Sequence, residues 1–452
     1  MTCEIPGPEL LDRLWAGLPV AFGEALRAIV EVADDRELPL FVVGGAVRDS
    51  LRAGSAGGLL DLDIAVEGDP GPLLAVLSQQ RGRRVVRHDR FGTGTLVLGS
   101  AGGLLGSAVG VLGSAGGVLG SAAGRIDLAR TRVERYVRPG ALPQVSAASI
   151  EADLSRRDFS VNAMALGLNG ARRGELLDPF DGRGDLQRGL IRTLHDHSFA
   201  DDPTRLIRAC RYGARLDARF APGMRAQALR SRGELRSISG DRFGEAWRRL
   251  LLDRAAPAAL VRASGLGIPQ AREGGWSIGL GLIDAFTGME GAGAPAFWAL
   301  TGLRAQSEVV SLLAGRCGLT RGERRALEAG AELRALRRPL GRAGLAASGA
   351  AGLLRSFDAM TLGAAASLWG GLAAERVERA LGEWADARAP LDATALAELG
   401  VEPGPAIGRW LEALRDAVID GDLPGGRRGA EPARLLVQAG LQSRRDRPSR
   451  RP

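Results

Sequence analysis

One stretch, residues 41–67, constrains the fold of this chain more than any other. An apolar run ends in Gly44-Gly45, and a short helix-like piece carrying Arg48 follows. A second apolar run then holds Asp61 and Asp63. Because side chains alternate across a β-strand, these two aspartates lie on the same face. Burying two unpaired carboxylates is costly, so the pattern favours a divalent metal between them.

The composition bounds the class of protein. A chain of 452 residues is long enough for two or three domains. Its net charge is +8, and all 60 basic residues are arginine. A positive balance favours an anionic partner, and nucleic acid is the obvious candidate.

The sequence also indicates a compartment. The cysteines at positions 3, 210 and 317 have no paired spacing, so they predict neither a disulfide framework nor a zinc site. That usage is typical of a reducing cytoplasm. The N-terminus has early acidic residues and no long apolar core, which is unlike a signal peptide. No apolar run reaches the length of a membrane span, so we expect a cytoplasmic protein without a membrane partner.

Residues 98–125 contain four tandem copies of a seven-residue unit, and residues 54–60 hold a near copy. Seven residues is far below the period of a solenoid. A membrane hairpin and a glycine-rich phosphate loop are two interpretations. We favour a third, a low-complexity repeat insertion in a surface turn between two strands. The role of the repeat stays open.

The pattern of apolar residues changes near residue 200. Before it, helices and strands alternate, which predicts a mixed α/β head of roughly 195 residues. Predicted helices there are 22–32, 72–80 and 149–157, and predicted strands are 38–43, 84–86, 95–98, 125–128 and 159–166. After residue 200 the expected helices are 203–216, 224–230, 242–251, 304–313, 321–337 and 406–418.

The predicted head carries the parts of a nucleotide-transfer site. A glycine turn with Arg48 can hold a triphosphate. Asp61 and Asp63 can hold two Mg²⁺ ions, which activate an attacking hydroxyl and neutralise the leaving phosphate. Further along, Arg157 would contact a phosphate and Asp158 a ribose hydroxyl. The alternative for this second pair is a surface cluster of salt bridges.

The segment 201–216 is the most informative after the opening stretch. Pro203 suits the first turn of a helix, and helical spacing puts Arg205, Arg208 and Arg211 on one side. A solvated basic face is one interpretation. The other is a base reader, in which the Asp202 carboxylate accepts from an amino group and Arg205 donates to a ring nitrogen. Cytosine and adenine fit that pattern, and guanine and uracil do not.

Six motifs occur in order over about residues 38–250: GGAVRD, DLDIAVE, RTRVERY, ADLSRRDFSVNAMA, LLDPFDGRGDLQRGLIR and DDPTRLIRACRY. As an ordered set they closely resemble the bacterial class II CCA-adding enzymes (tRNA nucleotidyltransferases) and the bacterial poly(A) polymerases. Residues 237–251 resemble the helical neck motif of that family, and residues 401–423 resemble its tRNA-binding tail.

The resemblance implies an α+β fold, with a polymerase-β-like nucleotidyltransferase head of mixed sheet and helices followed by an all-helical neck, body and tail. The implied divisions are a head at 1–195 with its insertion at 98–125, a neck at 196–260, a body and tail at 261–440, and a basic disordered tail at 441–452.

The resemblance also implies site residues. Asp61 and Asp63 would be the catalytic carboxylates and the Mg²⁺ ligands. The nucleotide-binding residues would be Gly44, Gly45, Arg48, Arg157, Asp158, Asp202, Arg205, Arg208 and Arg211. One departure is that the family's Glu-Asp pair is Asp201-Asp202 here, with the reading carboxylate intact. No histidine follows residue 197, which excludes the histidine-dependent phosphohydrolase domain of some members.

The implied activity is Mg²⁺-dependent, template-independent addition of C, C and A to tRNA 3′ ends from CTP and ATP, with release of pyrophosphate. The alternatives are a partial enzyme that adds only A or only CC, or a poly(A) polymerase. A catalytically inactive RNA-binding protein is a further alternative, and its expected signature is the loss of a metal carboxylate. The oligomeric state and the way addition terminates are left open by the sequence.

Overall fold

The structure is a computed structural model, and it divides the chain into two compact units, Met1–Arg272 and Glu273–Pro452. The described residues are 5–52, 61–79, 84–88, 93–98, 124–289, 291 and 293–445. The near copy of the repeat and residues 99–123 of its tandem copies lie outside the described residues, as do residues 446–452. How the helical part divides into neck, body and tail stays a prediction.

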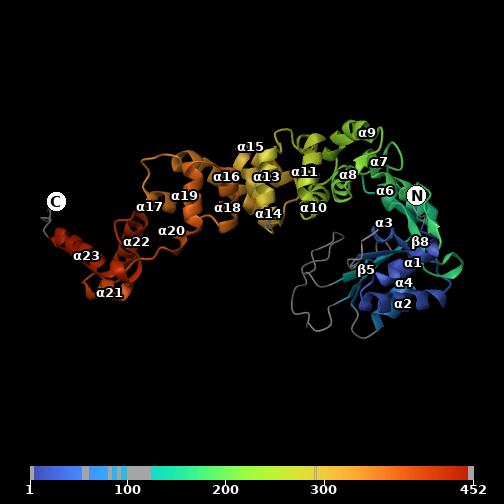
Figure 1. Ribbon diagram of the computed structural model, residues 1–452, viewed down its shortest axis with the longest axis horizontal. Helices are drawn as coiled ribbons and strands as arrows, with labels where there is room; N and C mark the ends of the chain where they lie inside the picture. Colours follow the sequence, from blue (N-terminus) through green and yellow to red (C-terminus); the bar gives the residue numbers. More distant parts are fainter. Residues whose placement is uncertain are drawn as a thin grey trace. The chain divides into compact units, whose positions relative to one another are not determined.

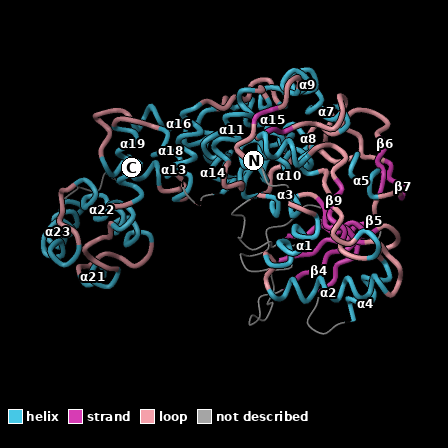
Figure 2. Tube along the Cα trace, turned by 45° about the vertical axis from the view of Figure 1, so that its right-hand side comes forward, coloured by secondary structure: helices cyan, strands magenta, loops and turns pink. Residues whose placement is uncertain are grey.

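The N-terminal unit is built on a seven-stranded sheet of order β3-β4-β5-β2-β1-β8-β9. The strands are β1 (Leu40–Val43), β2 (Asp61–Val66), β3 (Arg84–His88), β4 (Thr93–Leu98), β5 (Gly124–Arg130), β8 (Ala165–Gly167) and β9 (Leu176–Leu177). Neighbouring strands pair antiparallel except β2 and β5, which are parallel. Figure 2 shows these strands in magenta beside the helices of the same unit.

The two faces of the sheet differ, and this difference positions the site. On one face the core packs α1 (Gly7–Ala16), α2 (Val20–Asp34) and α4 (Gly71–Gln79) against alternate residues of β1, β2 and β5. On the other, Phe41, Val43 and Ala65 pack against α5 (Ile150–Ser155). Since β2 alternates, Leu62 and Ile64 point to the first face, which leaves Asp61 and Asp63 on the α5 face.

The rest of the N-terminal unit is mostly helical (Figure 1) and includes a short hairpin (Figure 2). The helices are α3 (Gly45–Leu51), α6 (Gly182–Arg188), α7 (Ser198–Asp201), α8 (Thr204–Arg215), α9 (Met224–Ser231), α10 (Gly240–Leu251), α11 (Ala256–Gly265) and α12 (Ile268–Arg272), with 3-10 turns η2 (Ser160–Asn162), η3 (Gly170–Arg172) and η4 (Arg232–Arg236). Two small sheets pair β6 (Arg132–Arg135) with β7 (Gln144–Ala147), and β10 (Leu190–Ile191) with β11 (Arg219–Phe220).

Among the described residues of the C-terminal unit, the regular elements are all helices. Its elements are α13 (Leu280–Gly288), α14 (Gly293–Arg304), α15 (Ser307–Arg316), α16 (Arg321–Leu340), α17 (Ala347–Leu354), α18 (Ala359–Leu368), α19 (Leu372–Leu381), α20 (Glu383–Asp386), α21 (Ala393–Glu398), α22 (Pro405–Asp420), η5 (Gly426–Gly429) and α23 (Ala430–Arg445). Among the described residues, no helix combines the length and apolar character that a membrane crossing requires.

The predicted fold class is confirmed, but three local predictions are wrong. Residues 159–166 are not one strand: η2 comes first, because Asn162 and Ala163 donate to Phe159 and Ser160 carbonyls, and β8 begins only at Ala165. Residues 304–313 are not one helix. They contain the end of α14 and most of α15, and the extended backbone of Gln306 separates the two helices. The helix α23 continues to Arg445, five residues into the predicted disordered tail.

Two glycines in the C-terminal unit test the packing directly. A Cβ on Gly302 of α14 would lie 2.1 Å from the Leu327 carbonyl oxygen of α16. We expect Gly302→Ala to lower the free energy of unfolding by about 1–3 kcal/mol, because backbone cannot yield cheaply. On α17, Gly352 meets nothing within 4 Å. The matched control Gly352→Ala should raise stability by ~0.5–1 kcal/mol through helix propensity. Urea unfolding measures both, and equal effects of the two variants would contradict the close approach of α14 and α16.

Candidate active site

A cavity of about 610 Å³ opens on the α5 face of the sheet, within the N-terminal unit. That volume lies inside the range of ~300–1,000 Å³ usual for small-molecule sites. Its walls come from the sheet, α5, α8 and α10, and they are rich in charged side chains. The charged lining residues are Asp63, Asp127, Arg132, Glu134, Asp153, Arg156, Arg157, Asp158, Asp202, Arg205, Arg208 and Arg242.

The glycine turn forms one wall of this cavity. Gly44 follows β1 with φ of +69°, a backbone conformation that favours glycine. Its N–H donates to the Met164 carbonyl oxygen at 3.1 Å, and a Cβ here would lie 3.0 Å from Arg157 Nη1. Gly45 also lines the cavity and begins α3. The turn therefore brings bare backbone next to the Arg157 guanidinium.

The carboxylates of β2 have a neighbour that the sequence analysis missed. The parallel register pairs Asp63 with Asp127 of β5, and both line the cavity. Thr95 of β4 donates its hydroxyl to Asp127 Oδ1 at 2.5 Å. No local pattern indicates Asp127, since 64 residues separate it from Asp63 and only the strand pairing joins them. The only sequence signal for Asp127 was its position as the single aspartate in the predicted strand 125–128.

The environment of Asp63 disfavours its negative charge. Its side chain reaches solvent through the cavity, yet protein surrounds it at short range. That enclosure raises the pKa of Asp63; Arg157 opposes the rise, and the carboxylates of Asp127 and Asp61 add to it. A cation between these groups would relieve the repulsion.

Asp61 does not line the cavity. Its carboxylate pairs with the Arg125 guanidinium of β5 through both oxygens, and 64% of its side chain is exposed. Within the described residues, no group of three or more Asp, Glu, His or Cys side chains is arranged to hold a metal ion. Mg²⁺ commonly takes only one or two carboxylates and fills its octahedron with water and substrate phosphate. Asp63 with Asp127 fits that donor set, and Asp61 joins it only if its pair with Arg125 opens.

Asp158 lines the cavity and is held by three contacts. It is 3% exposed, and its Oδ1 accepts from the Phe159 N–H at 2.9 Å and from Asn162 Nδ2 at 3.1 Å. Its Oδ2 lies 2.7 Å from Arg208 Nη2. Burial opposes ionisation, but Arg208, Asn162 and Arg205 outweigh it, and the pKa of Asp158 falls below its usual value. The group is therefore a charged acceptor at neutral pH.

The proposed base-reading residues both line the cavity, but each is held by other partners. Asp202 Oδ1 accepts from the Thr204 hydroxyl at 2.7 Å and from Arg242 Nη2 at 2.9 Å. Arg205 is buried and donates to Ser198 Oγ at 2.7 Å and to the Arg156 carbonyl oxygen at 2.6 Å. These bonds fix both side chains in place.

Two of the predicted nucleotide-binding residues do not line this cavity. Arg48 is 2% exposed, and it donates to both Asp49 oxygens at 2.9 Å and to Asn162 Oδ1 at 2.6 Å. Arg211 has its Nε 3.7 Å from Asp253 Oδ2 and its guanidinium over the Tyr212 ring. Since α3 begins at Gly45, helical phase turns Arg48 inward, where it orients the Asn162 side chain that contacts Asp158. A contact of either arginine with the nucleotide stays a prediction.

Residues that organise the arginines were also missed. Asp153 of α5 is 1% exposed and accepts from Arg156 at 2.7 Å and from Arg157 at 3.1 Å. Arg242 of α10 bridges Asp202 and the Gly140 carbonyl oxygen, to which it donates at 2.6 Å. Arg242 lies in the neck-like motif 237–251, so the motif was a signal for the element but not for this role.

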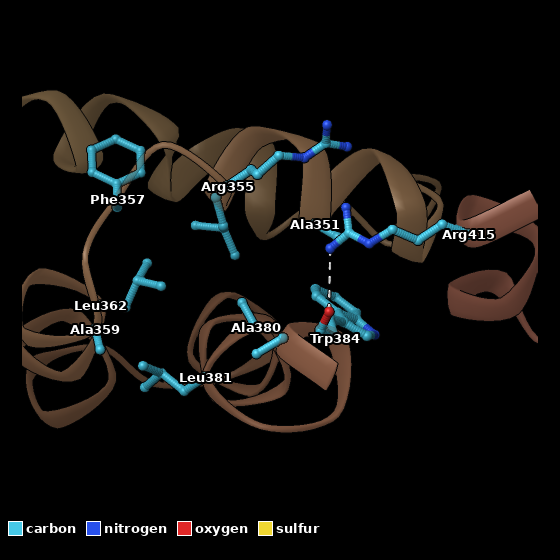
Figure 3. Close-up of a pocket in the computed structure, with 11 residues that line it drawn as sticks. Ala351, Arg355, Phe357, Ala359, Leu362, Ala380, Leu381, Trp384 and Arg415 are labelled. Carbon is cyan, nitrogen blue, oxygen red and sulfur yellow. Dashed lines mark hydrogen bonds between the residues drawn. The ribbon is translucent and has the colours of Figure 1, made fainter. Parts of the chain in front are cut away.

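A smaller cavity of about 310 Å³ lies in the C-terminal unit (Figure 3). Alanine, leucine and Phe357 side chains form most of its lining. Its arginines already have partners: Arg355 pairs with Glu412 at 2.8 Å, and Arg415 donates to the Trp384 carbonyl oxygen at 3.3 Å. It has no carboxylate in its lining, so it does not compete as a metal-dependent site.

Comparison with known proteins gives the family of the sheet-bearing part. Residues 40–192 match the model of the Poly A polymerase head domain. These residues belong to that head-domain family. The family predicted from the sequence is thus confirmed for residues 40–192.

Curated relatives match part of the chain. An A-adding tRNA nucleotidyltransferase of Halalkalibacterium halodurans is 41% identical over 197 residues, which are 44% of this chain and 40% of that protein. A CC-adding tRNA nucleotidyltransferase of Deinococcus radiodurans is 39% identical over 43% of this chain and 44% of that protein. A CCA-adding enzyme of Limosilactobacillus fermentum is 27% identical over 57% and 58%. The matches therefore span less than two thirds of these relatives.

Solved structures share the fold over nearly the whole chain. A CCA-adding enzyme in an apo form has a TM-score of 0.75 at 24% identity, covering 95% of this chain and 98% of that one. The Thermotoga maritima CCA-adding enzyme in complex with tRNA has a TM-score of 0.73 at 24% identity, with 95% and 98% covered. At such identity the likeness establishes the fold of head and helical parts alike.

The raised pKa of Asp63 gives a stability prediction. The folded state favours the protonated form of Asp63. Ionisation of Asp63 therefore lowers the free energy of unfolding at any pH above about 3.9, the pKa of an aspartate in the unfolded chain. We expect metal-free Asp63→Asn to melt above the wild type at pH 7. The difference should shrink as the pH falls through the raised folded pKa, because the wild type then becomes neutral as well.

Added Mg²⁺ provides the second half of this test. It should raise the melting temperature of the wild type, since it binds the folded state, and leave Asp63→Asn nearly unchanged. Asp12 is an exposed carboxylate of the same unit, so Asp12→Asn serves as the matched control and should keep the wild-type response. If Mg²⁺ raises the melting temperature of Asp63→Asn as much as that of the wild type, Asp63 is not a ligand of the metal.

Proposed function

We propose that this chain is a metal-dependent tRNA nucleotidyltransferase that adds C, C and A to tRNA 3′ ends from CTP and ATP without a template strand. One observation carries the proposal. A single cavity brings the paired-strand carboxylates Asp63 and Asp127 together with Arg157, Asp158 and the Asp202 side chain. Metal ligands, phosphate ligands and a base reader then lie within one nucleotide-sized space.

In the proposed reaction, the side chains on each wall of the cavity have a different role. Bound Mg²⁺ would be held by Asp63 and Asp127, with Asp61 as a third ligand, and would neutralise charge on the phosphates. The Gly44 turn and Arg157 hold the triphosphate. The tRNA 3′-hydroxyl attacks the α-phosphorus and loses its proton; the bond from that phosphorus to the bridging oxygen breaks, and pyrophosphate leaves.

Asp158 is the proposed ribose contact. Its Oδ2 is buried and makes no hydrogen bond within the described residues, although Arg208 lies 2.7 Å from it. An ionised carboxylate oxygen in that state is a strong acceptor for a hydroxyl. The Arg208 pair keeps the charge on Asp158, so the acceptor persists across neutral pH.

Base choice is assigned to Asp202 and Arg205. Arg242 and Thr204 hold the Asp202 carboxylate and leave lone pairs for an exocyclic amino group. A guanidinium has five N–H donors, so Arg205 keeps donors for a ring nitrogen beyond those given to Ser198 and Arg156. Cytosine and adenine satisfy this pair, whereas guanine and uracil oppose it.

A second candidate is addition of A alone, to tRNA that already ends in CC. The curated relatives at 41% and 36% identity include proteins named A-adding tRNA nucleotidyltransferases. Relatives named CCA-adding enzymes stand at 27% and 28%, and a relative named a multifunctional CCA protein is 38% identical over 27% of this chain. The same cavity serves both candidates, since A addition uses the same metal, phosphate and ribose contacts.

The deciding experiment supplies each nucleotide separately, with Mg²⁺, to tRNA lacking CCA and to tRNA ending in CC. Full CCA addition predicts C incorporation on the first substrate and A incorporation on the second, stopping after one A. Incorporation of A alone supports the second candidate. Long A tails would point to a poly(A) polymerase. Asp61→Ala and Asp63→Ala should abolish incorporation and leave tRNA binding largely intact, and binding without incorporation by the wild type would contradict enzymatic function.

The base-reading assignment predicts the behaviour of Asp202→Asn. The amide offers a donor where the carboxylate accepted, so the variant should lose about 1–3 kcal/mol of preference for C and A over G and U. Rates of incorporation for the four nucleotides measure this preference. The matched control is Asp217→Asn, because Asp217 is exposed and asparagine tolerates its φ of +49°. Unchanged selectivity in Asp202→Asn would assign base choice to other side chains.

A further inference from the structure

Arg125 is a cation built into the acidic face of the sheet. It is the last residue of the fourth repeat copy, where the preceding copies have Leu104, Val111 and Val118. It lies opposite Asp61 in the parallel register of β2 and β5, as Asp127 lies opposite Asp63. Since residues two apart share a face of a strand, the four side chains form one charged patch.

The Arg125 guanidinium contacts both ends of this patch. Its Nε and Nη2 donate to the two oxygens of Asp61, the second at 2.9 Å. Its Nε also lies 3.5 Å from Asp127 Oδ2. Thr95 already holds Asp127 Oδ1. A two-pronged pair of this kind fixes the orientation of a carboxylate as well as its charge.

We propose that Arg125 acts as an internal counterion that holds Asp61 out of the metal site and gives it up when a divalent cation binds. The inference rests on the proposed function, because it takes Asp61, Asp63 and Asp127 as the carboxylates around the metal. It explains why Asp61 does not line the cavity although it shares a strand face with Asp63. Arg125 is thus a positioning residue that acts through Asp61.

The exchange is physically easy because the pair is accessible. The Arg125 side chain is 28% exposed and that of Asp61 is 64% exposed. Exposed ion pairs contribute little to stability, so water and a divalent ion can replace this one. Without metal, Arg125 still offsets repulsion among neighbouring carboxylates. When a metal ion is bound, the ion offsets this repulsion instead, and Arg125 competes with the ion for Asp61.

The test measures binding of Mn²⁺ alone to the full chain, by electron paramagnetic resonance of free and bound ion. Arg125→Gln should bind Mn²⁺ about two- to fivefold more tightly than the wild type, the scale of an exposed ion pair. The matched control is Arg130→Gln, which removes one positive charge from the other end of the same strand, where the side chain is exposed. It should bind Mn²⁺ as the wild type does.

Thermal melting gives a second readout without activity. Metal-free Arg125→Gln should melt below the wild type, because its carboxylates lose their counterion. In saturating Mn²⁺ the wild type and the variant should melt at the same temperature, since Asp61 then pairs with an arginine in neither protein. If Arg125→Gln does not fold, Arg125→Lys replaces it: lysine keeps the charge without the two-pronged geometry, and it too should bind Mn²⁺ more tightly.

The outcomes separate this inference from the proposed function. If the wild type binds Mn²⁺ and Arg125→Gln binds it no more tightly, the inference is wrong and the metal site stands. Equal tightening in Arg125→Gln and Arg130→Gln also overturns it, because the effect is then one of net charge. If neither protein binds Mn²⁺, the metal site of the proposed function fails together with the inference.

Discussion

The ion pair between buried Asp158 and the partly exposed Arg208 is the interaction on which the candidate site depends. Asp158 follows α5 beside the sheet, and Arg208 lies on α8, so the pair ties the helix to the sheet-bearing part. Removing Arg208 would leave the Asp158 charge buried without that partner, at a cost that reaches about 3–5 kcal/mol for a fully buried pair. The pair therefore fixes where α8, and with it Asp202 and Arg205, stands above the carboxylate face.

Around that pair, the site is a set of arginines and carboxylates that orient one another. Asp153 holds Arg156 and Arg157, and Arg242 holds Asp202. Such networks leave few free rotamers, so the groups that would meet a nucleotide are placed before it binds. This order suits an enzyme that chooses bases with side chains, because a mobile reader would accept several hydrogen-bond patterns.

Much of this arrangement was predictable from local patterns. The glycine turn after an apolar run, the alternation of Asp61 and Asp63, and the helix after Pro203 each depend on residues close in sequence, and each is present. What could not be predicted depends on pairing across long separations. Asp127 joins Asp63 only through the parallel pairing of β2 and β5, and the same pairing brings Arg125 to Asp61.

The direction in which each side chain points was the other feature that the sequence did not predict. Motif position did not indicate that the phase of α3 buries Arg48 against Asn162, or that Arg211 lies near Asp253; a nucleotide contact of either arginine stays a prediction. A motif conveys which residues occur near a site and does not convey which way each one points. Arg242 shows the converse, since a side chain outside the predicted set holds the predicted reader.

The central claim is that protein side chains alone choose the nucleotide. It is tested most directly by equilibrium binding of each nucleoside triphosphate to the wild-type chain with Mg²⁺ and no RNA. The account predicts measurable binding of CTP and ATP, and binding of GTP and UTP weaker by about tenfold or more, as the opposed hydrogen-bond pattern requires. Equal affinity for all four nucleotides would contradict it.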